Sequence, residues 1–217
     1  DHTERLVAER ELTKNREMLL AIMNNSTSII TLKDLAGRYE FVNRQFETFF
    51  DVSAEKVIGK TDAKVMSRKM ADDFRAKELD VVRQRKALEF EDHLAIPSMG
   101  DRFLHSIRFP LLTEDGTVYS ICTQSVDVTE HKHAEDQLRL AARVFDRAGE
   151  GIVVTDARQI ILTVNEAFTQ VTGYTGEEVI GKTPAVLASG KHDKEFYLEM
   201  WSRLQNQGWW QGEVWNR

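Results

Sequence analysis

The stretch "VNRQFETFFDVSAEKVIGKT" at residues 42–61 has a counterpart, "VNEAFTQVTGYTGEEVIGKT", at residues 164–183. Both copies begin Val-Asn-x-x-Phe, both end Val-Ile-Gly-Lys-Thr, and they are offset by 122 residues without a gap. A chain of 217 residues has room for two domains of ordinary size. The repeat therefore predicts one folding unit that is used twice.

Composition narrows the class of protein. Hydrophobic residues make up 41% and charged residues 29%, a balance typical of globular domains with real cores. A net charge of -6 argues against a nucleic-acid partner, because phosphates favour a basic face. No run of about 18 apolar residues and no signal peptide is present, so we expect no membrane span.

The single cysteine, Cys122, excludes an internal disulfide and fits a reducing cytoplasm, so we expect a cytoplasmic location. The chain begins within a predicted helix and stops at "WQGEVWNR", inside a predicted strand. We therefore expect a fragment of a longer protein.

Residues 1–25 are expected to form an N-terminal signalling helix, because residues 2–25 contain neither Gly nor Pro. An apolar seam with one polar residue runs along it at spacings of four and three, as in a coiled coil, and an Asn in such a seam usually specifies a dimer and its register. The alternative is an amphipathic helix that packs on its own domain, and too few heptads are present to exclude it. The seam residues are Ala8, Leu12, Asn15, Leu19 and Ile22.

Residues 130–148 predict a linker helix with the same seam spacing, in which the seam includes Leu138, Ala141 and Phe145. A helix that enters the first domain and one that leaves it thus share one periodicity. We expect a homodimer that pairs through these helices.

Residues 26–129 predict an α+β domain. "SIITLKD" and "RYEFVN" indicate a hairpin, and a short helix follows that Ser53 can cap. The longer amphipathic helix at residues 67–86 places Met70, Phe74, Leu79 and Val82 roughly on one face, and three antiparallel strands come after it.

Residues 149–217 predict a second copy of this domain. The hairpin and short helices restart at Gly151, a helix covers "DKEFYLEMWSRLQNQG", and "WWQGEVWNR" is expected to begin a strand. Two further strands that the first copy has are missing, so we expect this domain to be incomplete.

The two copies resemble a tandem of PAS domains, the sensory modules of bacterial signalling proteins. In the first copy the resemblance is carried by "AIMNNSTSIITLKDLAGRYEFVNRQFE", "VIGKTD" and "DVTEHKHAEDQL". In the second it is carried by "GIVVTDARQIILTVNEAFTQVTGYTGEEVIGKTP" and "SGKHDKEFYLEMWSRLQNQGWWQGEVWNR". The resemblance implies a five-stranded antiparallel sheet with flanking short helices. Asp127 and Thr129 match the family's Asp-x-Thr, where the last strand passes into a signalling helix.

Six recurring residues have structural explanations, which we favour over direct ligand contact. Each Asn ends a strand and can turn its amide back onto the next helix, each Phe points into the core, and each Gly suits a positive φ after a helix. These residues are Asn43, Phe46, Gly59, Asn165, Phe168 and Gly181.

The second copy also resembles PAS domains of flavin-binding redox sensors. That resemblance implies a pocket in which Trp201 and Trp210 lie beside a flavin such as FAD and Asn216 meets its polar edge, with Asn165 nearby. Pro184 stands where those proteins can carry a carboxylate. The alternative is that Trp201 packs in the core and Asn216 is a strand or turn residue. The ligand therefore stays unknown.

Other chemistries find less support. A photochemical flavin–cysteine sensor needs a Cys beside the conserved Asn, and "NRQF" and "NEAF" have none. Haem-binding relatives usually supply a His from the long helix, but residues 67–86 contain none and His192 is the only candidate in the second copy, so haem is not expected. We predict no metal site and no catalytic activity, since no phosphate loop or nucleophile elbow is present.

The sequence thus predicts a sensory input region that detects a small ligand, a redox state or a partner. A change of roughly 1–3 kcal/mol in helix pairing would be enough to regulate an output domain. The second copy resembles those that precede cyclic-di-GMP synthase or phosphodiesterase domains, with a histidine kinase as the next choice. The rival hypothesis is a ligand-free dimerisation module.

Overall fold

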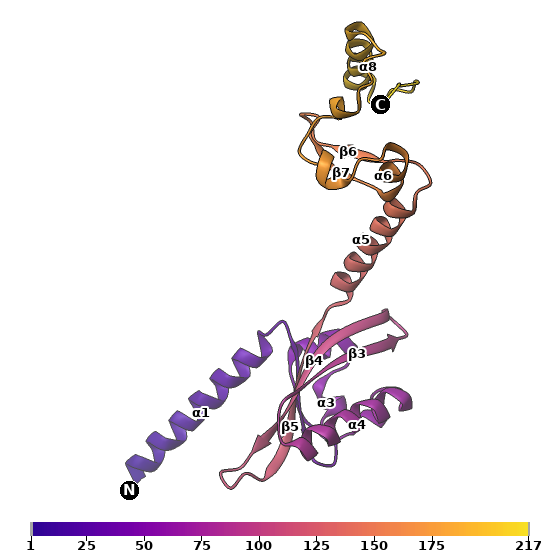
Figure 1. The fold of residues 1–217 in the computed structure, drawn as a ribbon. Coiled ribbons are helices and arrows are strands. Elements are labelled where there is room, and N and C mark those ends of the chain that lie inside the picture. The colour runs from indigo at the N-terminus through magenta and orange to yellow at the C-terminus, as the bar shows by residue number, and fades with distance from the viewer. Residues whose placement is uncertain (1, 217) are drawn as a thin grey trace. The chain divides into compact units, whose positions relative to one another are not determined.

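The computed structural model describes residues 2–216, so the expected domain limits at Asp1 and Arg217 lie outside the described residues. The chain forms two compact units, which meet in the sequence between Ala134 and Glu135 (Figure 1). We call them the first unit and the second unit.

The first unit is an antiparallel five-stranded sheet with helices on one face, in the strand order β2-β1-β5-β4-β3. Long-range pairing of β1 with β5 joins the β1–β2 hairpin to a meander formed by β3, β4 and β5. Its elements are α1 (His2–Asn24), β1 (Ile29–Asp34), β2 (Tyr39–Val42), α2 (Arg44–Phe50), α3 (Ala54–Val57), η1 (Asp62–Lys64), α4 (Arg68–Gln84), β3 (Leu88–Ile96), β4 (Gly100–Leu112) and β5 (Val118–Asp127).

The hydrophobic core of the first unit lies between the sheet and α2, α3 and α4. Two expectations were wrong in detail. Leu79 on α4 is exposed, because the buried stripe of that helix runs through Ala71, Glu78 and Val81 instead. Ser53 stands at the N-cap of α3 but its side chain makes no capping hydrogen bond.

Helix α5 (Thr129–Arg147) begins in the first unit and ends in the second. Its apolar Leu138 is exposed, as are Leu12, Leu19 and Ile22 on α1. Exposed apolar positions at seam spacing are compatible with helix pairing, and the dimer seam stays a prediction.

The second unit has a two-stranded sheet and a smaller core built on Ile161, Phe168, Val179 and Leu187. The expected strand in "WWQGEVWNR" was wrong: of residues 209–216, only Asn216 pairs, in an isolated bridge to Ala188. A strand forms when several consecutive residues pair with a neighbouring strand. In the described part of the chain, residues 209–216 have only the single bridge to Ala188. The elements are β6 (Val153–Thr155), β7 (Ile161–Val164), α6 (Glu166–Thr172), α7 (Gly176–Val179), η2 (Pro184–Leu187) and α8 (Lys194–Gln207).

Candidate functional sites

The second unit contains a cavity of about 450 Å³ between η2, α8 and the segment that follows α8. Trp201 and Asn216, which the sequence singled out, both line it. Pro184, Tyr197 and Met200 contribute further lining. A cavity of this size can hold a small organic ligand.

The segment that carries Asn216 is held by three contacts from the residues just before α8. Asn216 bridges to Ala188, and the Ser189 hydroxyl donates to the Trp215 carbonyl oxygen over 2.5 Å. The Trp215 N–H donates to Nε2 of His192 over 2.9 Å. The His192 ring stacks on Phe196 at a centroid distance of 3.9 Å.

His192 therefore anchors the Asn216 segment. To accept a hydrogen bond at Nε2, the imidazole must be neutral and carry its proton on Nδ1. The sequence suggested only two roles for His192, a haem ligand or a solvated residue near a helix cap. No local pattern predicts this contact, because Trp215 lies 23 residues further along the chain.

The other two residues of the expected pocket lie elsewhere. Trp210 packs edge-on against Phe196, with centroids 5.8 Å apart, and does not line the cavity. Asn165 is fully buried at the N-cap of α6. The structure thus brings two of the four candidate residues to one cavity.

The chemistry of the cavity suits a flat, partly polar ring. Trp201 and Met200 offer apolar surface on which a ring can pack, and the Asn216 amide can both donate and accept a hydrogen bond. Volume and donor set therefore fit a flavin ring, although Pro184 contributes no carboxylate.

Asn43 and Asn165 make the same four hydrogen bonds in their respective units. In each, the side-chain oxygen accepts two backbone N–H groups, and the amide nitrogen donates to two backbone carbonyls. One of those carbonyls belongs to the helix that precedes the hairpin, so the amide ties that helix to the hairpin and the following helix. The partners are Ile30, Phe46, Met23 and Ser28 for Asn43, and Ile152, Phe168, Phe145 and Glu150 for Asn165.

The recurring glycines and phenylalanines also occupy matching places. Gly59 and Gly181 have φ of 78° and 81°, in the left-handed region that favours glycine. Phe46 and Phe168 are both buried in the cores of their units. These four residues build the scaffold rather than line a ligand cavity, except that Phe46 also reaches the small cavity described below.

Thr129 ties the first turn of α5 to the sheet. Its hydroxyl donates to the Asp127 carboxylate over 2.5 Å and accepts the Phe103 N–H over 2.9 Å. A displacement of β4 would therefore act directly on the start of α5. The role of Asp127 and Thr129 in signal transfer stays a proposal.

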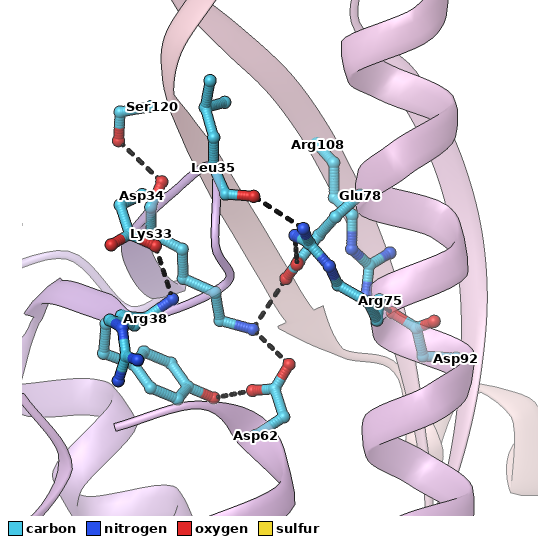
Figure 2. Close-up of polar contacts among 11 residues, drawn as sticks. Lys33, Asp34, Leu35, Arg38, Asp62, Arg75, Glu78, Asp92, Arg108 and Ser120 are labelled. Carbon is cyan, nitrogen blue, oxygen red and sulfur yellow. Dashed lines mark hydrogen bonds and ion pairs between the residues drawn. The ribbon is translucent and has the colours of Figure 1, made fainter. Parts of the chain in front are cut away.

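The first unit has a buried ionic cluster that the sequence did not predict. The Lys33 amine on β1 lies between Asp62 Oδ2, at 2.5 Å, and Glu78 Oε1, at 2.7 Å (Figure 2). All three side chains are at most 6% exposed. Arg75 also contacts Glu78 and donates to the Leu35 carbonyl.

Tyr39 completes this cluster by donating its hydroxyl to Asp62 Oδ1 over 2.5 Å. Burial, together with the neighbouring Asp62 carboxylate, raises the pKa of Tyr39 well above 10.0. The phenol therefore stays protonated, and a donor, throughout the neutral range.

A second buried ion pair lies next to the first. Asp92 on β3 receives Arg108, Lys77 and Ser106 at 2.8, 2.6 and 2.6 Å. Burial would raise the pKa of the Asp92 carboxyl, but these three donors outweigh burial and hold it below 3.8. Asp92 is therefore ionised at neutral pH.

These charged side chains leave little free space in the first unit. Its cavity, lined by Lys33, Glu78 and Arg108 among others, has a volume of about 30 Å³. That is room for a water molecule and too little for a ring.

Residues 2–216 offer little to metal or thiol chemistry. Within that range, no three or more His, Cys, Asp or Glu side chains gather as a metal site would require. Burial raises the pKa of the Cys122 thiol to about 11, so it is not a nucleophile at neutral pH. Every helix in the range is too short or too polar to span a bilayer.

Comparison with family models decides the assignment. Models of the PAS fold match residues 23–133 and, separately, residues 139–214. The chain belongs to the PAS family. Two tandem PAS domains account for the repeat, and each corresponds to one unit of the structure.

Two relatives similar to this chain are named as regulatory proteins. A nitrogen fixation regulatory protein of Klebsiella oxytoca is 36% identical over 74 residues, 34% of this chain and 15% of that protein. A methanogenesis regulatory histidine kinase of Methanothrix harundinacea is 25% identical over 99% of this chain and 23% of its own length. The chain thus spans less than a quarter of either relative.

Among solved structures, an RNA-binding light-oxygen-voltage receptor is 17% identical with a TM-score of 0.50. The similarity covers 59% of this chain and 37% of that one. At this identity the likeness shows the fold alone. The family and its regulatory relatives together assign a sensory or regulatory role to the chain.

Proposed function

We propose that the second PAS domain binds a planar ring ligand, with a flavin such as FAD as the first candidate. The observation that carries the proposal is that Trp201 and Asn216 line one cavity of about 450 Å³. An aromatic or thioether wall with one amide at its edge is a common arrangement for binding a flat heterocycle. The fold alone would not support this, since one fold hosts many functions.

We further propose that ligand binding alters how α1 and α5 pair in a homodimer and so regulates an output domain. The exposed Leu12, Leu19 and Leu138 support a paired state, since burial of such side chains would stabilise it. Cyclic-di-GMP turnover is the output that the sequence pattern favours. The histidine kinase relative supports phosphotransfer as the alternative, and the residues encoded after Arg217 distinguish the two. The unpaired Cys122 supports a cytoplasmic location.

Absorbance of the purified protein tests the ligand proposal. A bound flavin gives a band at about 450 nm, and haem gives one at about 400 nm. We expect the flavin band, with occupancy reduced at least tenfold in Trp201→Ala and Asn216→Ala. Trp209→Ala is the matched control, because Trp209 is exposed and lies outside the cavity.

A colourless protein that native mass spectrometry shows to carry no small molecule would overturn the ligand proposal. If that protein were dimeric, the ligand-free dimerisation module would be the better description. Leu12→Glu combined with Leu138→Glu should then give a monomer in light scattering, whereas an unchanged mass would overturn pairing through the helices.

A further inference from the structure

Arg108 is a buried cation with an unsatisfied donor. It lies on β4 with a side chain only 2% exposed. Its Nη2 donates to Asp92 over 2.8 Å, whereas its Nη1 is buried without a hydrogen-bond partner. Arginine cannot give up its proton, so each buried N–H of this group needs an acceptor. An unsatisfied buried donor of this kind is costly and calls for an explanation.

The guanidinium is held in place. Its central carbon lies 5.0 Å from the ring centroids of both Phe74 and Phe90. With the ion pair to Asp92, these contacts fix the group in the core, so Nη1 cannot turn to solvent for a partner.

Arg108 lines the small cavity of the first unit, whereas Asp92, the partner of its Nη2, does not. Arg108 pairs across the sheet with Thr123, and Thr123 pairs with Thr31, so these three residues form one row on the same face of the sheet. The hydroxyl-bearing residues Thr31, Thr123 and Ser125 line the same space. An N–H and hydroxyl groups around a void of about 30 Å³ can bind a very small polar species.

The charged residues that line the cavity favour an anion. They are two cations, Lys33 and Arg108, and one carboxylate, Glu78. Glu78 pairs with Lys33 over 2.7 Å, and Asp92, which pairs with Arg108, does not line the cavity. Among the lining residues, the charge of Arg108 therefore has no counter-ion.

We propose that Arg108, with the hydroxyls of Thr31 and Thr123, binds one small monoanion in the core of the first PAS domain. The volume limits the ligand to a halide, nitrate or formate. A charge-assisted hydrogen bond from Nη1 would hold it. This site is independent of the flavin proposal, because it lies in the other unit.

Salt titrations at constant ionic strength test the proposal. Sodium gluconate, whose anion is too large, is exchanged stepwise for bromide, nitrate or formate. Unfolding is followed by circular dichroism, which reports on both units, and by tryptophan fluorescence, which reports on the second unit alone, so the two together give the midpoint of the first unit. We expect a saturable rise in its thermal midpoint, since a ligand that binds only the folded state stabilises it. Separate titrations of the three anions show whether an inorganic ion or a carboxylate is preferred.

Two variants and one control make the test specific. Arg108→Gln should abolish the response, and Thr123→Val, which keeps the Arg108–Asp92 pair, should raise the apparent Kd at least tenfold. Arg102→Gln should leave it unchanged, because Arg102 also has a buried unpartnered Nε but does not line the cavity. A wild-type midpoint that is the same in all four salts, or a response that survives Thr123→Val, would overturn the proposal and assign the space to water.

Discussion

The two PAS domains share the backbone of their hairpin and of the short helices that follow it, and they differ in the residues at their centre. In the first, Tyr39 donates to the Lys60 carbonyl and accepts the Gly59 N–H; in the second, Ile161 does the same with Lys182 and Gly181. The bonds differ in length by at most 0.1 Å, between 2.8 and 2.9 Å. Backbone geometry therefore survives a change of side chain from Tyr to Ile.

The buried charged residues of the first domain are not repeated in the second. At the offset of 122 residues, the positions of Lys33, Asp62 and Glu78 are taken by Thr155, Pro184 and Met200. The free volume is about 30 Å³ in the domain with the ions and about 450 Å³ in the domain without them. The first domain thus has a five-stranded sheet and an ion cluster beside its small cavity, whereas the second has a two-stranded sheet and a larger cavity that Pro184 and Met200 line.

The largest effect is expected from removing the central cation. Lys33→Met leaves Asp62 and Glu78 buried without their main partner, which should lower the free energy of unfolding of the first domain by about 3–5 kcal/mol. All four tryptophans lie in the second unit. Tryptophan fluorescence during urea unfolding therefore reports on the second domain, where we expect no change, and circular dichroism reports on both.

Two controls sharpen this result. Arg68→Met breaks an exposed pair with Asp72 and should cost less than about 1 kcal/mol. The triple variant Lys33→Thr, Asp62→Pro, Glu78→Met imports the residues of the second domain and should recover part of the loss, since no buried charge is left unpaired. Equal losses in Lys33→Met and Arg68→Met would show that the ion cluster stabilises the first domain no more than an exposed ion pair does.

The next largest effect should be equal in both domains. Asn43→Ala and Asn165→Ala each remove four hydrogen bonds to backbone groups that are partly or fully buried, and each should destabilise its own domain by about 2–3 kcal/mol. Fluorescence should detect Asn165→Ala only. Asn43→Asp and Asn165→Asp keep the acceptor and lose the donors, so an intermediate loss is expected. Unequal losses in the two domains would contradict the shared role.

The repeat itself explains why so much of the fold was predictable. Residues such as Asn43 and Gly59 bond to backbone groups, which are present whatever the side chain, so the motif carries much of their geometry. The Lys33 cluster was not predictable, because its members lie 29 and 45 residues apart and an acidic residue on an amphipathic helix usually faces water. For the same reason Leu79, rather than Glu78, was expected in the core.

The candidate pocket was predictable in part. Trp201 and Asn216 came from a family resemblance and line one cavity. Trp210 lies outside it, since its position depends on packing against Phe196 rather than on any local pattern. His192 was missed because its partner, the Trp215 N–H, is a backbone group that no side-chain motif marks.

Acid should destabilise the first domain more strongly than the second. A carboxyl whose pKa is lowered by folding stabilises the fold above its ordinary pKa of 3.8, and that contribution is lost as the pH falls through the folded-state pKa. Asp92 is such a group and is buried, whereas Glu178 of the second domain, whose pKa is lowered by hydrogen bonds from Thr175, is exposed.

Urea midpoints measured from pH 7 to pH 3 test this difference. Below about pH 4 the circular dichroism transition of the first domain should move to lower urea more steeply than the fluorescence transition of the second. Asp92→Asn should flatten that slope, with Asp72→Asn on the surface as its control. Parallel slopes in the two domains would show that buried carboxylates do not distinguish them.

The smallest effect is expected at a pair of equivalent positions that hold an apolar residue in the first domain and a hydrogen-bond acceptor in the second. The first domain has Met70 packed against its core, and 122 residues later the second has His192, which stacks on Phe196 and accepts the Trp215 N–H. His192→Met keeps an apolar contact with Phe196 and removes the acceptor, which should cost about 1 kcal/mol. Hydrogen exchange of the Trp215 amide should then quicken about fivefold. His133→Met, on α5, is the control. Because Trp215 precedes Asn216, an accelerated exchange with unchanged ligand occupancy would mean that Asn216 reaches the cavity without this anchor, and that the ligand itself orders the segment.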